Sequence, residues 1–88
     1  MDVIAVKRAK GSVTVEILKA RNGVYYVEWS APNNAEVIGY IAEHHASDSW
    51  MGAVFHEDSE DYESIVEDTW ADAVEVAFKI AFAEGIYE

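Results

Sequence analysis

The sequence predicts an α+β fold, in which an antiparallel β-meander of four to five strands packs against one C-terminal amphipathic α-helix. Three observations predict it. Apolar and polar residues alternate in the first third of the chain, an Asn-Gly pair separates two β-rich runs, and a stripe of apolar residues with helical period follows Thr69. The 88 residues contain no linker or repeat, so we expect a single domain over 1–88.

The N-terminal third predicts three strands. The first covers 3–8, and Gly11 lies in the turn that follows it. In the second strand, over 13–18, valine and isoleucine alternate with threonine and glutamate, a period of two residues. Asn22-Gly23 then predicts a type I′ hairpin turn, because both residues tolerate positive φ. The return strand covers 24–30, and we expect its alternate residues to share one face: Tyr25, Val27 and Trp29.

The segment 35–46 is open to two interpretations. Val37, Ile38 and Ile41 have the spacing of one helical face, and Asn34 would cap such a helix. However, Gly39 disfavours a helix interior, and valine, isoleucine and tyrosine favour strands. We therefore prefer a second hairpin, formed by 36–45 and 50–56.

The last third predicts a loop followed by a helix. Residues 57–68 are acidic and indicate a loop, with room for one helical turn or a short strand. Thr69 and Asp72 form a capping box, which predicts a helix over about 70–84 with Gly85 as its C′ residue. Three aromatic residues are the candidates for the core: Trp29, Phe55 and Phe78.

Composition excludes several classes of protein. There is no cysteine, so disulfides, thiolate metal sites and cysteine nucleophiles are absent. The start of the chain lacks the pattern of a signal peptide, and no apolar run approaches the roughly 20 residues of a membrane span. We expect a cytoplasmic protein, located in the host cell cytoplasm if a phage encodes it.

No motif predicts catalysis or a cofactor. His44 and His45 point to opposite faces of a strand, so only one of them can approach His56, and no zinc-binding spacing occurs. The acids near Asp58 lack the glycine and the spacing of a calcium loop. No phosphate loop and no nucleophile elbow is present. The expectation is a protein that is not an enzyme and has no cofactor, no metal and no direct contact with nucleic acid.

Charge is distributed unevenly along the chain. The net charge is −11, but residues 1–21 carry +3 and residues 22–88 carry −14. The segment 57–75 holds nine carboxylates and no cation. Like charges at helical spacing destabilise a helix, and a surface selected only for solubility usually mixes both signs. This clustering therefore favours a binding role.

These carboxylates predict a small acidic inhibitor that occludes the basic nucleic-acid-binding surface of a partner protein. Their separation along a helix approximates that of neighbouring phosphates, and the partner would be a nucleic-acid-binding protein or a nuclease complex. Compact acidic proteins of this type occur among phage anti-defence factors, including anti-CRISPR proteins, an analogy of size, charge and outline. The predicted contact residues are Glu57, Asp58, Glu60, Asp61, Tyr62, Glu63, Glu67, Asp68, Asp72 and Glu75.

Two alternatives stay open. The chain could be a non-catalytic binding module or small subunit that pairs through its sheet edge or helix, with acidity that serves only solubility. A halophilic source would also give an acidic surface. Salt distinguishes a charge-driven interface from an apolar one, because only the first weakens steeply as ionic strength rises.

Overall fold

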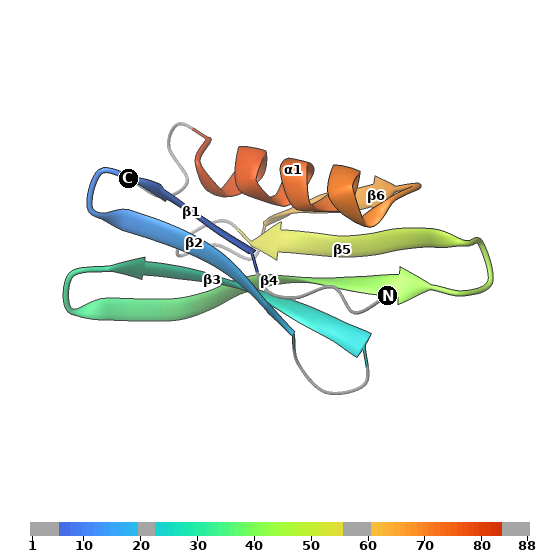
Figure 1. The fold of residues 1–88 in the computed structure, drawn as a ribbon, viewed down its shortest axis with the longest axis horizontal. Helices are drawn as coiled ribbons and strands as arrows, with labels where there is room; N and C mark the ends of the chain where they lie inside the picture. The colour runs from blue at the N-terminus through green and yellow to red at the C-terminus, as the bar shows by residue number, and fades with distance from the viewer. Residues whose placement is uncertain (1–5, 20–22, 56–60, 84–88) are drawn as a thin grey trace.

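The computed structural model describes residues 6–19, 23–55 and 61–83, and it confirms the α+β class. One antiparallel sheet contains six strands in chain order, and a single helix lies across one of its faces (Figure 1). The elements are β1 (Val6–Lys10), β2 (Val13–Lys19), β3 (Val24–Ala31), β4 (Asn34–His44), β5 (Ser49–Phe55), β6 (Tyr62–Glu67) and α1 (Trp70–Ala81).

The sheet has six strands rather than four to five because β6 forms within the predicted acidic loop. All six residues of β6 pair with β5, from Tyr62 opposite Phe55 to Glu67 opposite Trp50. Within β6 only Ile65 is buried, and Glu63 and Glu67 share its face of the strand. These two carboxylates interrupt the alternation of apolar and polar residues, so the sequence pattern concealed the strand.

Residues with positive φ occupy the turns of the first four hairpins. They are Gly11, Gly23, Asn33 and Asp48, with φ between 54° and 73°. Pro32 precedes Asn33, and proline followed by positive φ is typical of a type II turn. The pairing of β2 with β3 confirms the hairpin predicted around Asn22-Gly23, although Asn22 itself lies outside the described residues. The predicted strand over 3–8 is described only from Val6 onward.

A β-bulge explains why 35–46 resembles a helix. The segment is a strand, and its pairing with β5 confirms the preferred second hairpin. Opposite β3, Val27 faces Gly39 and Glu28 faces Val37, so Ile38 is the extra residue of the bulge. The bulge shifts the phase of alternation and buries both Ile38 and Ile41, three residues apart. A spacing of three is the spacing of a helix, although here it arises within a strand.

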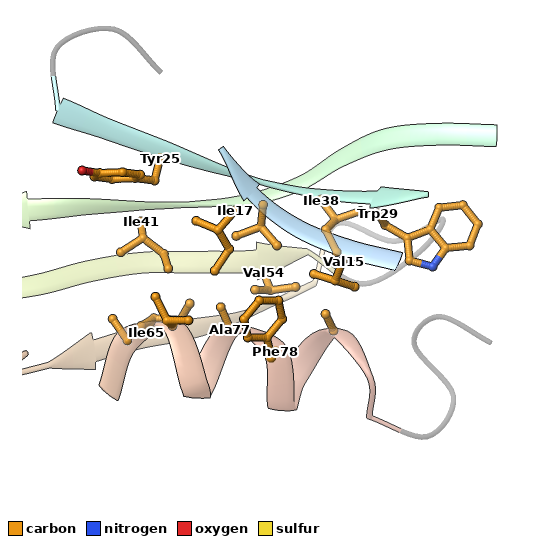
Figure 2. Packing of buried hydrophobic residues seen from close by; sticks show 14 of the residues in the cluster. Val15, Ile17, Tyr25, Trp29, Ile38, Ile41, Val54, Ile65, Ala77 and Phe78 are labelled. Atoms are coloured by element: carbon orange, nitrogen blue, oxygen red, sulfur yellow. The ribbon is translucent and has the colours of Figure 1, made fainter. Parts of the chain in front are cut away.

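The core fills the space between the sheet and the helix. Figure 2 shows Ala77 and Phe78 of α1 directed toward Val54 of β5 and Ile65 of β6. The predicted common face of Tyr25, Val27 and Trp29 is confirmed, and the structure shows that this face points inward, because all three residues are buried. Other buried side chains of the strands include Val15, Ile17, Ile38 and Ile41. Burial of such apolar surface is the main term that stabilises the fold.

One predicted core residue lies on the other side of the sheet. Trp29 and Phe78 are buried, but Phe55 is 43% exposed. Phe55 belongs to the same face of β5 as Met51, whereas Val54 faces the core. The prediction for Phe55 was therefore wrong, because an aromatic residue in a strand is buried only if a layer covers its face.

The helix begins where the sequence predicts. Thr69 has extended backbone angles, and its Oγ1 accepts a hydrogen bond of 3.1 Å from the backbone N–H of Asp72. The helix ends at Ala81, three residues before the predicted end. The N–H of Ala83 then bonds to the carbonyl of Ile80, which tightens the last turn. Gly85 lies outside the described residues.

An aromatic cluster anchors the start of the helix. Trp70 is the first helical residue, and its ring centroid lies 4.3 Å from that of Tyr25 in β3 and 5.0 Å from that of Trp50 in β5. The rings are tilted or edge-to-face, the arrangements that aromatic pairs prefer. The cluster joins two strands and the helix, so it sets where α1 lies on the sheet.

Two glycines allow β4 and β5 to approach closely. A Cβ atom on Gly52 would lie 1.9 Å from the backbone oxygen of Tyr40, and one on Gly39 would lie 2.3 Å from that of Ala53. Backbone atoms cannot move aside as flexible side chains can. Both positions therefore require glycine, in keeping with the use of strand glycines where a sheet bends sharply.

We expect Gly52→Ala to lower the free energy of unfolding by about 3 kcal/mol or more, because the methyl group meets the backbone of β4. Gly11→Ala is the matched control. Nothing lies within 4 Å of its added Cβ, and its φ of +62° predicts a loss of only about 1–2 kcal/mol. Urea unfolding followed by circular dichroism measures both, and equal losses would contradict this account of Gly52.

Candidate functional site

The predicted contact residues that the structure describes gather around β6 and the first two turns of α1. Glu57, Asp58 and Glu60 lie outside the described residues. Asp61 precedes β6, Asp68 follows it, and the remaining acids lie on these two elements. We call Asp61, Glu63, Glu67, Asp68 and Asp72 the acidic end of the molecule. Apart from the half-buried Glu67, they are exposed.

A short connection brings the strand and helix carboxylates together. Only Asp68 and Thr69 separate the last residue of β6 from the first residue of α1. The cap at Thr69 holds this junction, and Glu67 and Asp72 border the same surface cleft of about 530 Å³. In the part of the chain that is described, no cation lies within ion-pair distance of Glu67, Asp68 or Asp72.

Glu75 is in a different electrostatic situation, because it pairs with Arg8 of β1. The Arg8 guanidinium donates two hydrogen bonds to the two carboxylate oxygens, one of them 3.0 Å long. The hydrogen bond from Arg8 is the main cause that lowers the pKa of Glu75, and the attraction between the charges adds to it. The Arg8 Cζ also lies 4.7 Å from the centroid of the Phe78 ring.

This pair joins the first strand to the helix and reduces the helical array of negative charge. The sequence places Asp68, Asp72 and Glu75 at spacings that approximate those of phosphates, but Arg8 offsets the charge of Glu75. Arg8 and Lys79 also border the cleft that Glu67 and Asp72 line. Among the described carboxylates, those of Glu67, Asp68 and Asp72 at the β6–α1 junction therefore keep their charge without an ion pair, whereas the charge of Glu75, one turn further along the helix, is offset.

Tyr62 is the described aromatic residue most available beside the acidic end. Its side chain is 58% exposed, and it lies on the face of β6 opposite to Glu63 and Glu67. Its ring contacts Phe55, with 6.1 Å between centroids. Trp50, in contrast, packs within the aromatic cluster at the start of the helix. A partner that contacts both Tyr62 and the carboxylates must reach around the edge strand.

The described histidines contact their own turn. Nδ1 of His44 lies 2.5 Å from Oγ of Ser47, and Nδ1 of His45 lies 3.1 Å from a carboxylate oxygen of Glu43. Both side chains are exposed, and His56 lies outside the described residues. Within the described ranges, no three histidine, aspartate or glutamate side chains are grouped so that they could hold a metal ion.

Sequence reasoning missed the uncovered face of the sheet. Seven large apolar side chains are 38–60% exposed on the face opposite to α1, and we call them the open patch: Tyr26, Val37, Tyr40, Met51, Phe55, Tyr62 and Val66. A signal was present in β4 and β5, where apolar residues occupy both alternating sets of positions. Such a strand is expected to be covered on both faces, and here only one is covered.

A hollow of about 390 Å³ lies within the open patch. Small residues form its floor, because Gly52 and Ala53 of β5 lie beside Ser64 of β6. Larger side chains border it on two sides: Met51 and Val66 on one, Phe55 and Tyr62 on the other. The hollow can accept an apolar side chain, and no carboxylate lines it.

Comparison with protein-family models, with curated proteins and with solved structures finds no match to this chain. In the described part of the chain, the helix is too short to cross a membrane. The features that indicate a function are therefore two surfaces of the chain itself, the acidic end and the open patch.

The pairing of Arg8 with Glu75 predicts a pH-dependent contribution to stability. Because the pKa of Glu75 is lowered in the folded state, its contribution is present above the unfolded value of about 4.3 and is lost as pH falls through the lower, folded value. We expect Glu75→Gln to lower the melting temperature at pH 7, and to have no effect once the pH is well below that folded value.

Thermal unfolding of wild type and variant over a range of pH measures this difference. Glu36→Gln is the control, because Glu36 is an exposed carboxylate outside this pair. Its removal should not lower the melting temperature at pH 7. A destabilisation by Glu75→Gln that stays constant as the carboxyl becomes protonated would contradict the assignment.

Proposed function

We propose that this chain is a small, non-catalytic inhibitor or interaction protein that uses its acidic end to occlude the basic nucleic-acid-binding surface of a partner. One observation carries the proposal. Glu67, Asp68 and Asp72 lie at a capped strand–helix junction, and none of them has an ion-pair partner among the described residues. Charges on a rigid junction do not need to be ordered on binding, which lowers the entropic cost of association.

Electrostatics makes a basic partner the favoured one. The chain has a net charge of −11, so it repels nucleic acid and attracts proteins with a positive groove. Opposite fields speed the encounter and weaken as salt screens them. A cationic groove evolved for phosphates would thus meet carboxylates instead. A phage anti-defence role, such as that of anti-CRISPR proteins, is the biological setting that this proposal suggests.

A second function is favoured by a different observation. The open patch exposes apolar and aromatic side chains, the types enriched at the centres of protein interfaces. A binding module or small subunit that associates through this face would use the acidic residues only for solubility. The two functions use opposite faces of β6, so separate variants can test them.

The acidic-end proposal is tested with two variants that change charge equally. The first neutralises Asp61, Glu63, Glu67 and Asp68 as amides. The control neutralises four carboxylates of β3, β4 and the β4–β5 turn: Glu28, Glu36, Glu43 and Asp48. Tagged wild type captures partners from a nuclease-treated lysate of the host cell. Displacement of a labelled DNA or RNA duplex from each purified partner is then followed by fluorescence anisotropy.

We expect wild type and the control variant to displace the duplex and the acidic-end variant to fail. Raising salt from about 50 to 200 mM should weaken wild-type binding at least tenfold, because screening acts on exposed charges. Circular dichroism verifies that both variants are folded. Equal displacement by the two variants would reject the acidic end as the contact surface, and so would binding that does not respond to salt.

A further inference from the structure

The open patch is large for an exposed apolar surface. Its seven side chains expose roughly 600 Å² together, at the upper limit of about 300–600 Å² for the largest apolar patch of a typical monomer. The side chains form continuous rows across the strands. Tyr26 lies opposite Tyr40, which lies opposite Ala53, and Met51 lies opposite Val66. A patch of this size needs an occupant.

Among the described residues, the part of the patch on β4, β5 and β6 is free of acidic side chains, whereas on β3 Glu28 shares this face, opposite Val37. The outward positions of β5 and β6 hold Met51, Ala53 and Phe55, then Tyr62, Ser64 and Val66. On β4 the outward positions from 37 to 44 are Val37, Tyr40, Ala42 and His44, so they hold no carboxylate. The carboxylates of β6 lie on its other face. Two molecules with the same net charge of −11 can therefore pack the outer faces of β4, β5 and β6 together without opposing carboxylates from these strands.

We propose that the open patch is the interface of a homodimer, in which the outer faces of β4–β6 from two copies pack together about a two-fold axis. Such an isologous interface pairs the same patch on both subunits, so apolar surface meets apolar surface. Stable interfaces bury about 800 Å² per partner, and the surface of roughly 600 Å² that these seven residues expose approaches that size once the polar positions around them are added. The hollow floored by Ala53 and Ser64 receives an apolar side chain of the other copy.

This dimer gives the second layer that the sheet lacks. Antiparallel sheets packed face to face stand about 10 Å apart, with their inner side chains interdigitated. In the monomer, α1 covers one face of the sheet and solvent covers the other. In the dimer, both faces of β4 and β5 are covered, which matches the apolar residues on both sides of these strands. The acidic end stays outside the interface, although Tyr62, which lies beside it in β6, belongs to the open patch.

Sedimentation velocity over about 1–500 µM tests the proposal. We expect wild type to reach twice the mass of the chain within this range. Ser64→Glu places a carboxylate beside the floor of the hollow and should weaken the dimer at least tenfold, because each copy then buries an unpaired charge. Val66→Glu tests the neighbouring row in the same way. Ser12→Glu, in the exposed β1–β2 turn, is the matched control and should remain dimeric.

The response to salt distinguishes association through the open patch from binding through the acidic end. Dimerisation of two negative copies should strengthen or stay constant as salt rises, whereas binding to a basic partner should weaken. A wild type that remains monomeric at the highest concentration would overturn the proposal. Equal dimerisation of Ser64→Glu and Ser12→Glu, with both folded by circular dichroism, would also overturn it. If Ser64→Glu abolishes the binding of a captured partner but leaves the dimer intact, the open patch is the contact surface for that partner and not for a second copy.

Discussion

The structure depends on one packing constraint, namely that a single helix covers one face of a six-stranded sheet. Ala73, Ala77 and Ala81 give α1 small residues on its inner face, so it lies close to the strands. Phe78 fills the space between the helix and the strands, and the aromatic cluster at Trp70 holds one end of the helix. One helix provides one covering layer, so the other face of the sheet retains exposed apolar side chains. This asymmetry produces the open patch.

The same arrangement places the carboxylates of the edge strand β6 on one of its faces and its exposed apolar side chains on the other. In β6, odd-numbered positions face the helix side and carry Glu63, Ile65 and Glu67, whereas even-numbered positions face outward and carry Tyr62, Ser64 and Val66. A strand alternates its side chains by geometry, so one short segment contributes carboxylates to one surface and apolar groups to the other. The two proposed contacts can therefore exist in one molecule, and a charge-driven contact does not exclude an apolar one.

The electrostatic balance is set partly within the fold. The basic N-terminal segment does not remain apart from the acidic remainder, because Arg8 of β1 reaches across to Glu75 and Phe78 of the helix. This contact ties the first strand to the last element and removes one carboxylate from the predicted phosphate-like array. Of the described carboxylates on β6 and α1, those at the junction of the two elements therefore carry the charge that Arg8 does not offset.

The sequence by itself determined the features that depend on neighbouring residues. The alternation in β2 and β3, the positive-φ turn residues, the cap at Thr69 and the total charge all follow from residues close together in the chain. Four features needed the tertiary structure. The bulge at Ile38 and the strand β6 depend on pairing with adjacent strands, and this pairing outweighs the conformational preference of the local sequence. The Arg8–Glu75 pair joins residues 67 positions apart, and the exposure of Phe55 depends on which face α1 covers. Distant pairing and the choice of covered face come from packing over the whole chain, and no local pattern encodes them.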